Sequence, residues 1–331
     1  MGEDKGTVCV TGGTGFVASW LIKVLLHEGY SVHTTVRADP GNKRDLSFLT
    51  SLPGADEKLK FFTADLDHPE SFDAAIQGCK GVFHVAAPVD FPAKDPEPVV
   101  TQRAVNGSLG ILKSCLRSKT VKRVVYTSSI AAVYNNIHNK DVEMMDESYW
   151  SDADYIRKTL EPSGSSYAVS KTLTEKAMSE FAAEHGLDLV TVVPPMVLGP
   201  FICPKMHGTV RATLSPILGN REDYHFLINA AMVHVDDLSR ALIFLLEHPE
   251  AKGRYNCSSD TVTIQQVVEI LSTNYPEFRI ADSVGEAKGP KVPGLWSKKL
   301  TDLGFKFKNG VKEMYDGAIQ SCKEKGLLDL D

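Results

Sequence analysis

The sequence lacks long apolar runs and an excess of positive charge. No uninterrupted apolar stretch in its 331 residues approaches the roughly 18 residues that a membrane-spanning helix needs. The formal net charge is −6, which disfavours binding to nucleic acid or to an anionic membrane through overall charge. We therefore expect no nucleic-acid partner and no membrane insertion.

Cysteine is also sparse, and no Cys-x-x-Cys pattern occurs. The six cysteines are Cys9, Cys79, Cys115, Cys203, Cys257 and Cys322. Scattered cysteines in a chain of this size predict free, buried thiols, and we predict no metal site. Residues 1–5 lack a basic stretch followed by an apolar one, so no secretory signal is predicted. These features together predict a cytoplasmic protein.

What the sequence does contain is ordinary globular composition, 43% hydrophobic and 24% charged. Short β-branched runs alternate with helix-length stretches in the first half. The runs cover residues 7–11, 31–37, 59–63, 81–85, 121–127 and 189–193, and the main helical stretches cover 16–28, 69–77 and 97–117. This alternation predicts an α/β fold, a doubly wound parallel sheet of the Rossmann type covered by helices on both faces.

The rhythm changes after Pro194-Pro195, and residues 195–232 show no clear period. Helical patterns resume at 235–247, 263–272 and 311–325, and 254–257 reads as a short strand. We predict a nucleotide-binding domain of residues 1–194, to which about 233–258 also contribute. Residues 195–232 and 259–331 are predicted to form a smaller C-terminal substrate-binding lobe.

A glycine-rich loop follows the first predicted strand and opens a helix. Gly12 permits a tight turn, Gly15 lets a pyrophosphate approach the backbone, and Ala18 stands where a third glycine often lies. This context of strand, turn and helix predicts a dinucleotide site. The predicted cofactor contacts in this loop are Gly12, Thr14, Gly15, Phe16 and Val17.

The end of the second strand indicates which dinucleotide binds. An NAD site usually has an acidic residue there, but this strand ends in Arg37, with Lys43 and Arg44 close behind. A guanidinium can hold a 2′-phosphate with two parallel hydrogen bonds. We therefore predict NADP(H).

Further cofactor contacts are expected at the carboxyl ends of later strands, where ligands bind in open α/β sheets. They are Asp65, Leu66, Val85, Ala86, Ala87, Pro194, Met196 and Val197.

Tyr167 and Lys171 are four residues apart in a predicted helix, so they project from the same face. Reducing a carbonyl needs a hydride at carbon and a proton at oxygen. Tyrosine is a weak acid near neutrality, and a nearby ammonium lowers its pKa. Tyr167 is predicted to deliver the proton, with Lys171 as its partner. Both residues are also predicted to contact the cofactor, Lys171 through the nicotinamide ribose.

A serine at the end of the fifth strand can orient the substrate oxygen toward Tyr167. Ser128 and Ser129 compete for this role. Spacing favours Ser129 as the catalytic serine, with Ser128 turned toward the cofactor.

Seven runs carry a closer resemblance. They are residues 8–19, 78–88, 146–152, 167–173, 233–237, 253–258 and 303–305. With the motifs above they resemble extended short-chain dehydrogenase/reductases of the plant dihydroflavonol 4-reductase type, and residues 37–45 look most like vestitone reductase, an isoflavonoid enzyme. Tyr134 departs from dihydroflavonol 4-reductases, which carry an asparagine or similar polar residue there.

The resemblance implies an oxidoreductase of plant secondary metabolism that reduces a flavonoid or isoflavonoid ketone with NADPH. Alternatives are a cinnamoyl-type aldehyde or CoA-thioester reductase and a catalytically silent NADP-binding regulatory protein. A small phenolic substrate is expected, bound by a monomer or weak homo-oligomer. The candidate substrate-pocket residues are Pro88, Phe91, Tyr134, Phe201, His225 and Phe226.

Overall fold

A seven-stranded, wholly parallel sheet forms the centre of the molecule in the computed structural model, which describes residues 4–38, 44–88, 95–136, 142–160, 162–280 and 293–328. The strand order is β10-β7-β5-β4-β1-β2-β3. The strands are β1 (Thr7–Val10), β2 (Ser31–Val36), β3 (Leu59–Thr63), β4 (Gly81–His84), β5 (Arg123–Thr127), β7 (Leu189–Val193) and β10 (Gly253–Asn256). The doubly wound sheet expected from the sequence is confirmed.

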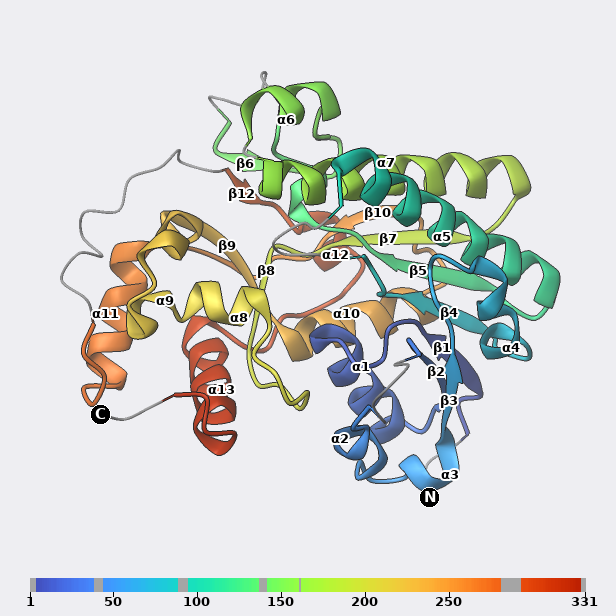
Figure 1. Cartoon of the computed structure of the whole chain (residues 1–331), viewed down its shortest axis with the longest axis horizontal. Helices are drawn as coiled ribbons and strands as arrows, with labels where there is room; N and C mark the ends of the chain where they lie inside the picture. The colour runs from blue at the N-terminus through green and yellow to red at the C-terminus, as the bar shows by residue number, and fades with distance from the viewer. Residues whose placement is uncertain are drawn as a thin grey trace.

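Helices cover both faces of this sheet because the strands are apolar on both sides. In Figure 1, α5 (Glu97–Ser118) and α7 (Pro162–His185) lie together on one face, and α1 (Phe16–His27) and α10 (Val235–Glu247) pack on the other. The expected helix at residues 69–77 is instead η1 (Pro69–Phe72), a 3₁₀ turn, followed by one turn of α-helix, α4 (Asp73–Ile76). The short helices α2 (Ser47–Thr50) and α3 (Ala55–Lys58) connect β2 to β3.

The remaining elements build a second region around a three-stranded sheet of order β11-β9-β8. Its strands are β8 (Met196–Leu198), β9 (Asn229–His234) and β11 (Asp260–Thr263), and the helices beside it are α8 (Gly208–Thr213), α9 (Ser215–Leu218), η4 (Arg221–Leu227), α11 (Ile264–Asn274) and α13 (Val311–Glu324). The helices at 263–272 and 311–325 were expected. The strands β8 and β9 were not, because no strand had been predicted within residues 195–232.

A two-stranded parallel ladder completes the fold. It pairs β6 (Met144–Met145) with β12 (Gly294–Leu295), and α12 (Lys298–Asp302) follows. The turn η2 (Ile130–Ala132) and the helix α6 (Ala153–Thr159) lie between β5 and α7. In the described residues no helix is long and apolar enough to cross a membrane. All six cysteines have free, buried thiols.

Candidate active site

Tyr167, Lys171 and Ser129 meet at the carboxyl edge of the central sheet. Ser129 directly follows β5, and α7 carries the other two residues one turn apart. The Ser129 hydroxyl is hydrogen-bonded to the Tyr167 hydroxyl. The Lys171 Nζ donates to the backbone carbonyl of Thr127, at 2.9 Å, and Lys171 is only 6% exposed. The fold thus brings together the three residues that the sequence proposed for catalysis.

Burial sets the protonation of this trio. It raises the pKa of Tyr167, and the Ser129 hydrogen bond opposes that rise. It lowers the pKa of Lys171 to about 8, against the opposing charge of Glu175. Lys171 was expected to lower the pKa of Tyr167, whereas desolvation raises this pKa above its ordinary value. A phenol with a raised pKa is protonated at neutral pH, which is the state that a proton donor requires.

A small cavity is lined by Tyr167 and Lys171 together with the residues that follow β4. Its lining includes Tyr167, Lys171, Tyr126, Ala86 and Ala87. The remaining lining residues are Pro88, Ala104, Ser108, Ser170 and Thr174. Ala86 and Ala87, predicted for the cofactor, and Pro88, predicted for the substrate, therefore share a cavity with the proposed proton donor.

The glycine loop has the features of a site for a bound anion. Gly12 has φ of 73°, and a Cβ there would lie 3.1 Å from the Cα of Ala86, so both conformation and space favour glycine. Gly15 begins α1 without a side-chain cap, and the first turn carries no acidic residue. The first N–H groups of a helix have no intrahelical acceptor. This end of α1 therefore fits a pyrophosphate.

A buried hydrogen-bonded chain, which the sequence did not reveal, fixes the loop opposite Gly12. The Thr11 hydroxyl accepts the backbone N–H groups of Val85 (3.1 Å) and Ala86 (3.0 Å). Its own hydrogen is then directed to His84 Nδ1, at 3.0 Å, so Nε2 carries the ring hydrogen and donates to Ser108, at 2.9 Å. Burial and the Lys171 charge lower the pKa of His84 to about 3, so the imidazole ring stays neutral, in this tautomer, near pH 7.

The residues proposed to select the 2′-phosphate follow β2. Arg37 is exposed. Arg44 is half-buried, and its Nη1 donates to the Thr14 hydroxyl of the glycine loop, at 3.3 Å. Lys43 lies outside the described residues. The structure therefore connects one of the predicted basic residues directly to the loop beside which the phosphates are expected.

Asp65 and Leu66 follow β3 as expected, with structural contacts of their own. The Asp65 carboxylate accepts the N–H of Asp67, at 3.1 Å. Leu66 packs against Gly107 of α5, where a Cβ would lie 2.7 Å from the Leu66 Cβ. These contacts close the turn after β3.

The candidate substrate residues are spread over several environments. Tyr134 is half-buried, and desolvation, with a smaller contribution from the nearby Tyr167, raises its pKa. Phe201 is 3% exposed and packs edge-on against Phe16, with ring centroids 6.4 Å apart. The rings of His225 and Phe226 in η4 lie in tilted contact, with centroids 3.9 Å apart, and Phe226 is exposed. Phe91 lies outside the described residues.

The segment after β7 also passes the site. The Pro194 carbonyl accepts the N–H of Ile130, at 2.9 Å, which ties it to the turn that Ser129 begins. Met196 and Val197 form β8 beside β9, with Met196 half-buried and Val197 buried. Ser128, expected to face the cofactor, donates its hydroxyl to Glu175 instead.

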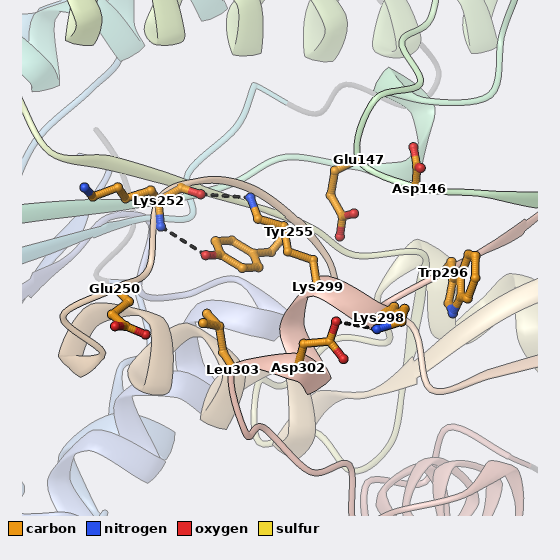
Figure 2. A pocket seen from close by; sticks show the side chains of 10 residues that line it. All are labelled: Asp146, Glu147, Glu250, Lys252, Tyr255, Trp296, Lys298, Lys299, Asp302 and Leu303. Atoms are coloured by element: carbon orange, nitrogen blue, oxygen red, sulfur yellow. Dashed lines mark hydrogen bonds and ion pairs between the residues drawn. The ribbon is translucent and has the colours of Figure 1, made fainter.

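A larger cleft of about 700 Å³ lies elsewhere and shares no lining residue with the cavity at Tyr167. Figure 2 shows its mixed acidic, basic and aromatic lining. Several of these groups are already engaged: Lys298 pairs with Asp302, and Lys299 donates to the backbone carbonyls of Lys252 and Arg254. The larger cleft is therefore separate from the site that the sequence predicts.

This fold and this trio define a nicotinamide-dependent oxidoreductase. Residues 8–258 match the NAD dependent epimerase/dehydratase family, and the chain belongs to that family. It is 54% identical to vestitone reductase of Medicago sativa over 99% of this chain and 100% of that one. The crystal structure of the alfalfa enzyme superposes with a TM-score of 0.88, at 52% identity, covering 98% and 100% of the two chains.

Other relatives extend the comparison. The Arabidopsis thaliana protein BRI1-5 ENHANCED 1 is 50% identical over 98% of this chain and 91% of its own. A bifunctional dihydroflavonol 4-reductase/flavanone 4-reductase of Malus domestica is 44% identical over 100% and 94%. The yeast methylglyoxal/isovaleraldehyde reductase Gre2, solved with NADPH, has a TM-score of 0.80 at 28% identity, covering 97% and 100%.

Proposed function

We propose that this chain is an NADPH-dependent reductase that converts the ketone of a flavonoid or isoflavonoid to an alcohol. The observation that carries the proposal is the Ser129–Tyr167 hydrogen bond, formed beside a buried Lys171. The likeness to vestitone reductase and to a dihydroflavonol 4-reductase supports the substrate class. NADPH is supported by the yeast neighbour and by Arg44 beside the glycine loop.

The proposed roles follow from charge and position. Bound along the glycine loop, NADPH supplies the hydride. Ser129 holds the carbonyl oxygen of the substrate, and the Tyr167 hydroxyl gives that oxygen a proton. Lys171 stabilises the phenolate that remains, because a nearby ammonium favours the charged form. The residues proposed to hold the cofactor are Gly12, Gly15 and the first turn of α1, with Arg37 and Arg44 at the 2′-phosphate and Ala86 and Ala87 beside the adenosine.

The proposal extends to the rest of the molecule. The nucleotide-binding domain comprises residues 1–194 with a contribution from 233–258, and the other segments after 194 form the substrate lobe. β10 supports this division because it joins the central sheet beside β7. The proposed protein acts in the cytoplasm, as a monomer or weak homo-oligomer, on a small phenolic molecule.

A substrate panel tests the reaction. Purified protein is incubated with NADPH and isoflavanones, flavanones, dihydroflavonols, phenolic aldehydes or cinnamoyl-CoA, and products are separated by chromatography. We expect alcohols from one of the first three classes. Reduction of the aldehydes or the thioester alone would favour the cinnamoyl-type alternative, and binding of NADPH without any product would favour the silent regulatory protein.

A single substitution tests the proton donor. Tyr167→Phe removes the hydroxyl but keeps the ring, so we expect kcat to fall about 10²- to 10⁴-fold. The dissociation constant for NADPH, measured by fluorescence titration, should change much less. Undiminished turnover by this variant would refute the assigned role.

A further inference from the structure

A buried ion pair lies next to the catalytic trio. Glu175 follows Lys171 by one turn on α7, and its side chain is 1% exposed. Its carboxylate accepts hydrogen bonds from Arg254 Nε, at 2.6 Å, and Nη2, at 3.3 Å, and a third from the Ser128 hydroxyl. Burying two charges is costly unless they are paired and hydrogen-bonded. A pair this well satisfied is a built feature of the fold.

Every hydrogen-bond donor of Arg254 has an acceptor. A guanidinium carries five N–H groups. Besides those used on Glu175, Nη1 donates to the carbonyls of Tyr149, at 2.5 Å, and Glu147, at 3.3 Å, and Nη2 donates to the carbonyl of Ala132, at 3.1 Å. The last strand of the central sheet is thereby joined to α7, to the turn after β5 and to residues 147–149.

Ser129 lies between two residues that this pair holds. The preceding residue, Ser128, is bonded to Glu175, and the carbonyl of Ala132, three residues on, is bonded to Arg254. Between these anchors Ser129 begins η2, and its hydroxyl accepts the N–H of Ala131, at 3.2 Å. The ion pair therefore fixes both ends of the turn that carries the serine.

Glu175 is also the charged neighbour of Lys171. Lys171 faces Tyr167 and Glu175 on its own helix, the Tyr126 ring on β5, at 5.2 Å, and His84 on β4. Burial keeps the pKa of both tyrosines above the ordinary value and holds that of His84 at about 3, so all three are neutral near pH 7. Among these neighbours the Glu175 carboxylate is therefore the charged group, and it favours the protonated form of Lys171.

We infer that Glu175 and Arg254 are positioning residues for the reduction. They hold Ser129 at the Tyr167 hydroxyl, and Glu175 supports the positive charge of Lys171, without either residue touching the substrate. The inference rests on the proposed reductase function. A misplacement of about 1 Å at a reacting group can cost about 100-fold in rate.

Glu175→Gln tests this inference, because it keeps the shape of the side chain and removes its charge. We expect kcat to fall about 10- to 100-fold, while the dissociation constant for NADPH changes less than about 3-fold. The alkaline limb of the kcat profile should move to lower pH, because Lys171 loses its proton more readily without the carboxylate. A residue that only stabilises the fold would not move that limb.

The opposite end of β5 offers a matched control. Arg123 also combines a carboxylate, that of Asp188 at 2.9 Å, with backbone carbonyls, those of Leu245 and His248. Asp188→Asn removes a charge from this arginine at the amino edge of the sheet. This variant should keep the wild-type kcat and pH profile.

Hydrogen exchange of the backbone amides of residues 129–133 gives a readout that needs no turnover. It should quicken in Glu175→Gln and in Ser128→Ala, which removes one hydroxyl and leaves the ion pair intact, and stay unchanged in Asp188→Asn. Wild-type kcat, pH profile and exchange in Glu175→Gln would overturn the inference, as would equal losses in Asp188→Asn. If Glu175→Gln fails to fold, Ser128→Ala decides by kcat and exchange alone, because it keeps the Glu175 charge and should leave the pH profile unchanged. A wild-type protein without turnover would instead refute the proposed function, and the exchange result would still test the anchoring.

Discussion

Lys171 is a buried cation, and its replacement by methionine should show how much the buried charge lowers the free energy of unfolding. Burial lowers the pKa of Lys171 from 10.5 to about 8. At about 1.4 kcal/mol per pKa unit, this shift corresponds to about 3 kcal/mol of destabilisation at neutral pH. Methionine is similar in length and carries no charge, so the variant escapes that cost.

The direction of the pH effect follows from proton binding. Between about pH 8 and pH 10.5 the unfolded chain keeps the lysine proton while the folded chain has released it. Stability rises with pH wherever the unfolded state binds more protons. The penalty is therefore fully present below about pH 8 and is relieved as the pH rises toward 10.5.

Urea unfolding of wild type and Lys171→Met at about pH 7 and about pH 9.5 measures this effect. We expect the wild type to gain about 2 kcal/mol relative to the variant between these two conditions. The variant also leaves the Thr127 carbonyl without its 2.9 Å donor, but that loss is the same at both pH values and cancels. Parallel stability curves for the two proteins would refute the argument that the charge is desolvated.

Two further substitutions test the glycine loop and the cofactor choice. Gly13→Ala would place a Cβ 2.1 Å from the Thr34 hydroxyl, so the free energy of unfolding in urea should fall by about 1–3 kcal/mol. Adding Thr34→Ala should restore part of this loss, and an unchanged free energy in Gly13→Ala alone would mean that the loop relaxes freely. Arg37→Asp should weaken NADPH at least about 10-fold more than NADH in fluorescence titrations, because a carboxylate repels the 2′-phosphate; equal losses for both cofactors would remove Arg37 as the selector.

Much of the central sheet was predictable because most of its strands are short runs rich in β-branched residues and its long helices have a clear period. The strands β8 and β9 were missed because residues 195–232 show no clear period. The strand β11 was missed with them, and it pairs with β9, as Thr261 does with Ala231. The ladder between β6 and β12 joins residues about 150 positions apart. Pairing over such distances leaves no local pattern.

The site was predictable where it rests on helical spacing, as for Tyr167 and Lys171. Glu175 continues that spacing by another four residues, so the sequence did contain a signal for it. Its partner Arg254 lies 79 residues further on, and only the fold brings the two together. The raised pKa of Tyr167 was also missed, because burial depends on tertiary packing.

The dependence of the serine turn on Arg254 also bears on the order in which the protein is made. Everything needed for the proposed proton transfer is present once residue 171 has been synthesised, yet the cation that neutralises Glu175 arrives about eighty residues later. A nascent chain that ends before β10 holds the Glu175 carboxylate without Arg254, next to the turn that carries Ser129. If Arg254 holds the serine turn as inferred above, full activity is reached only after the last central strand, β10, has docked beside β7.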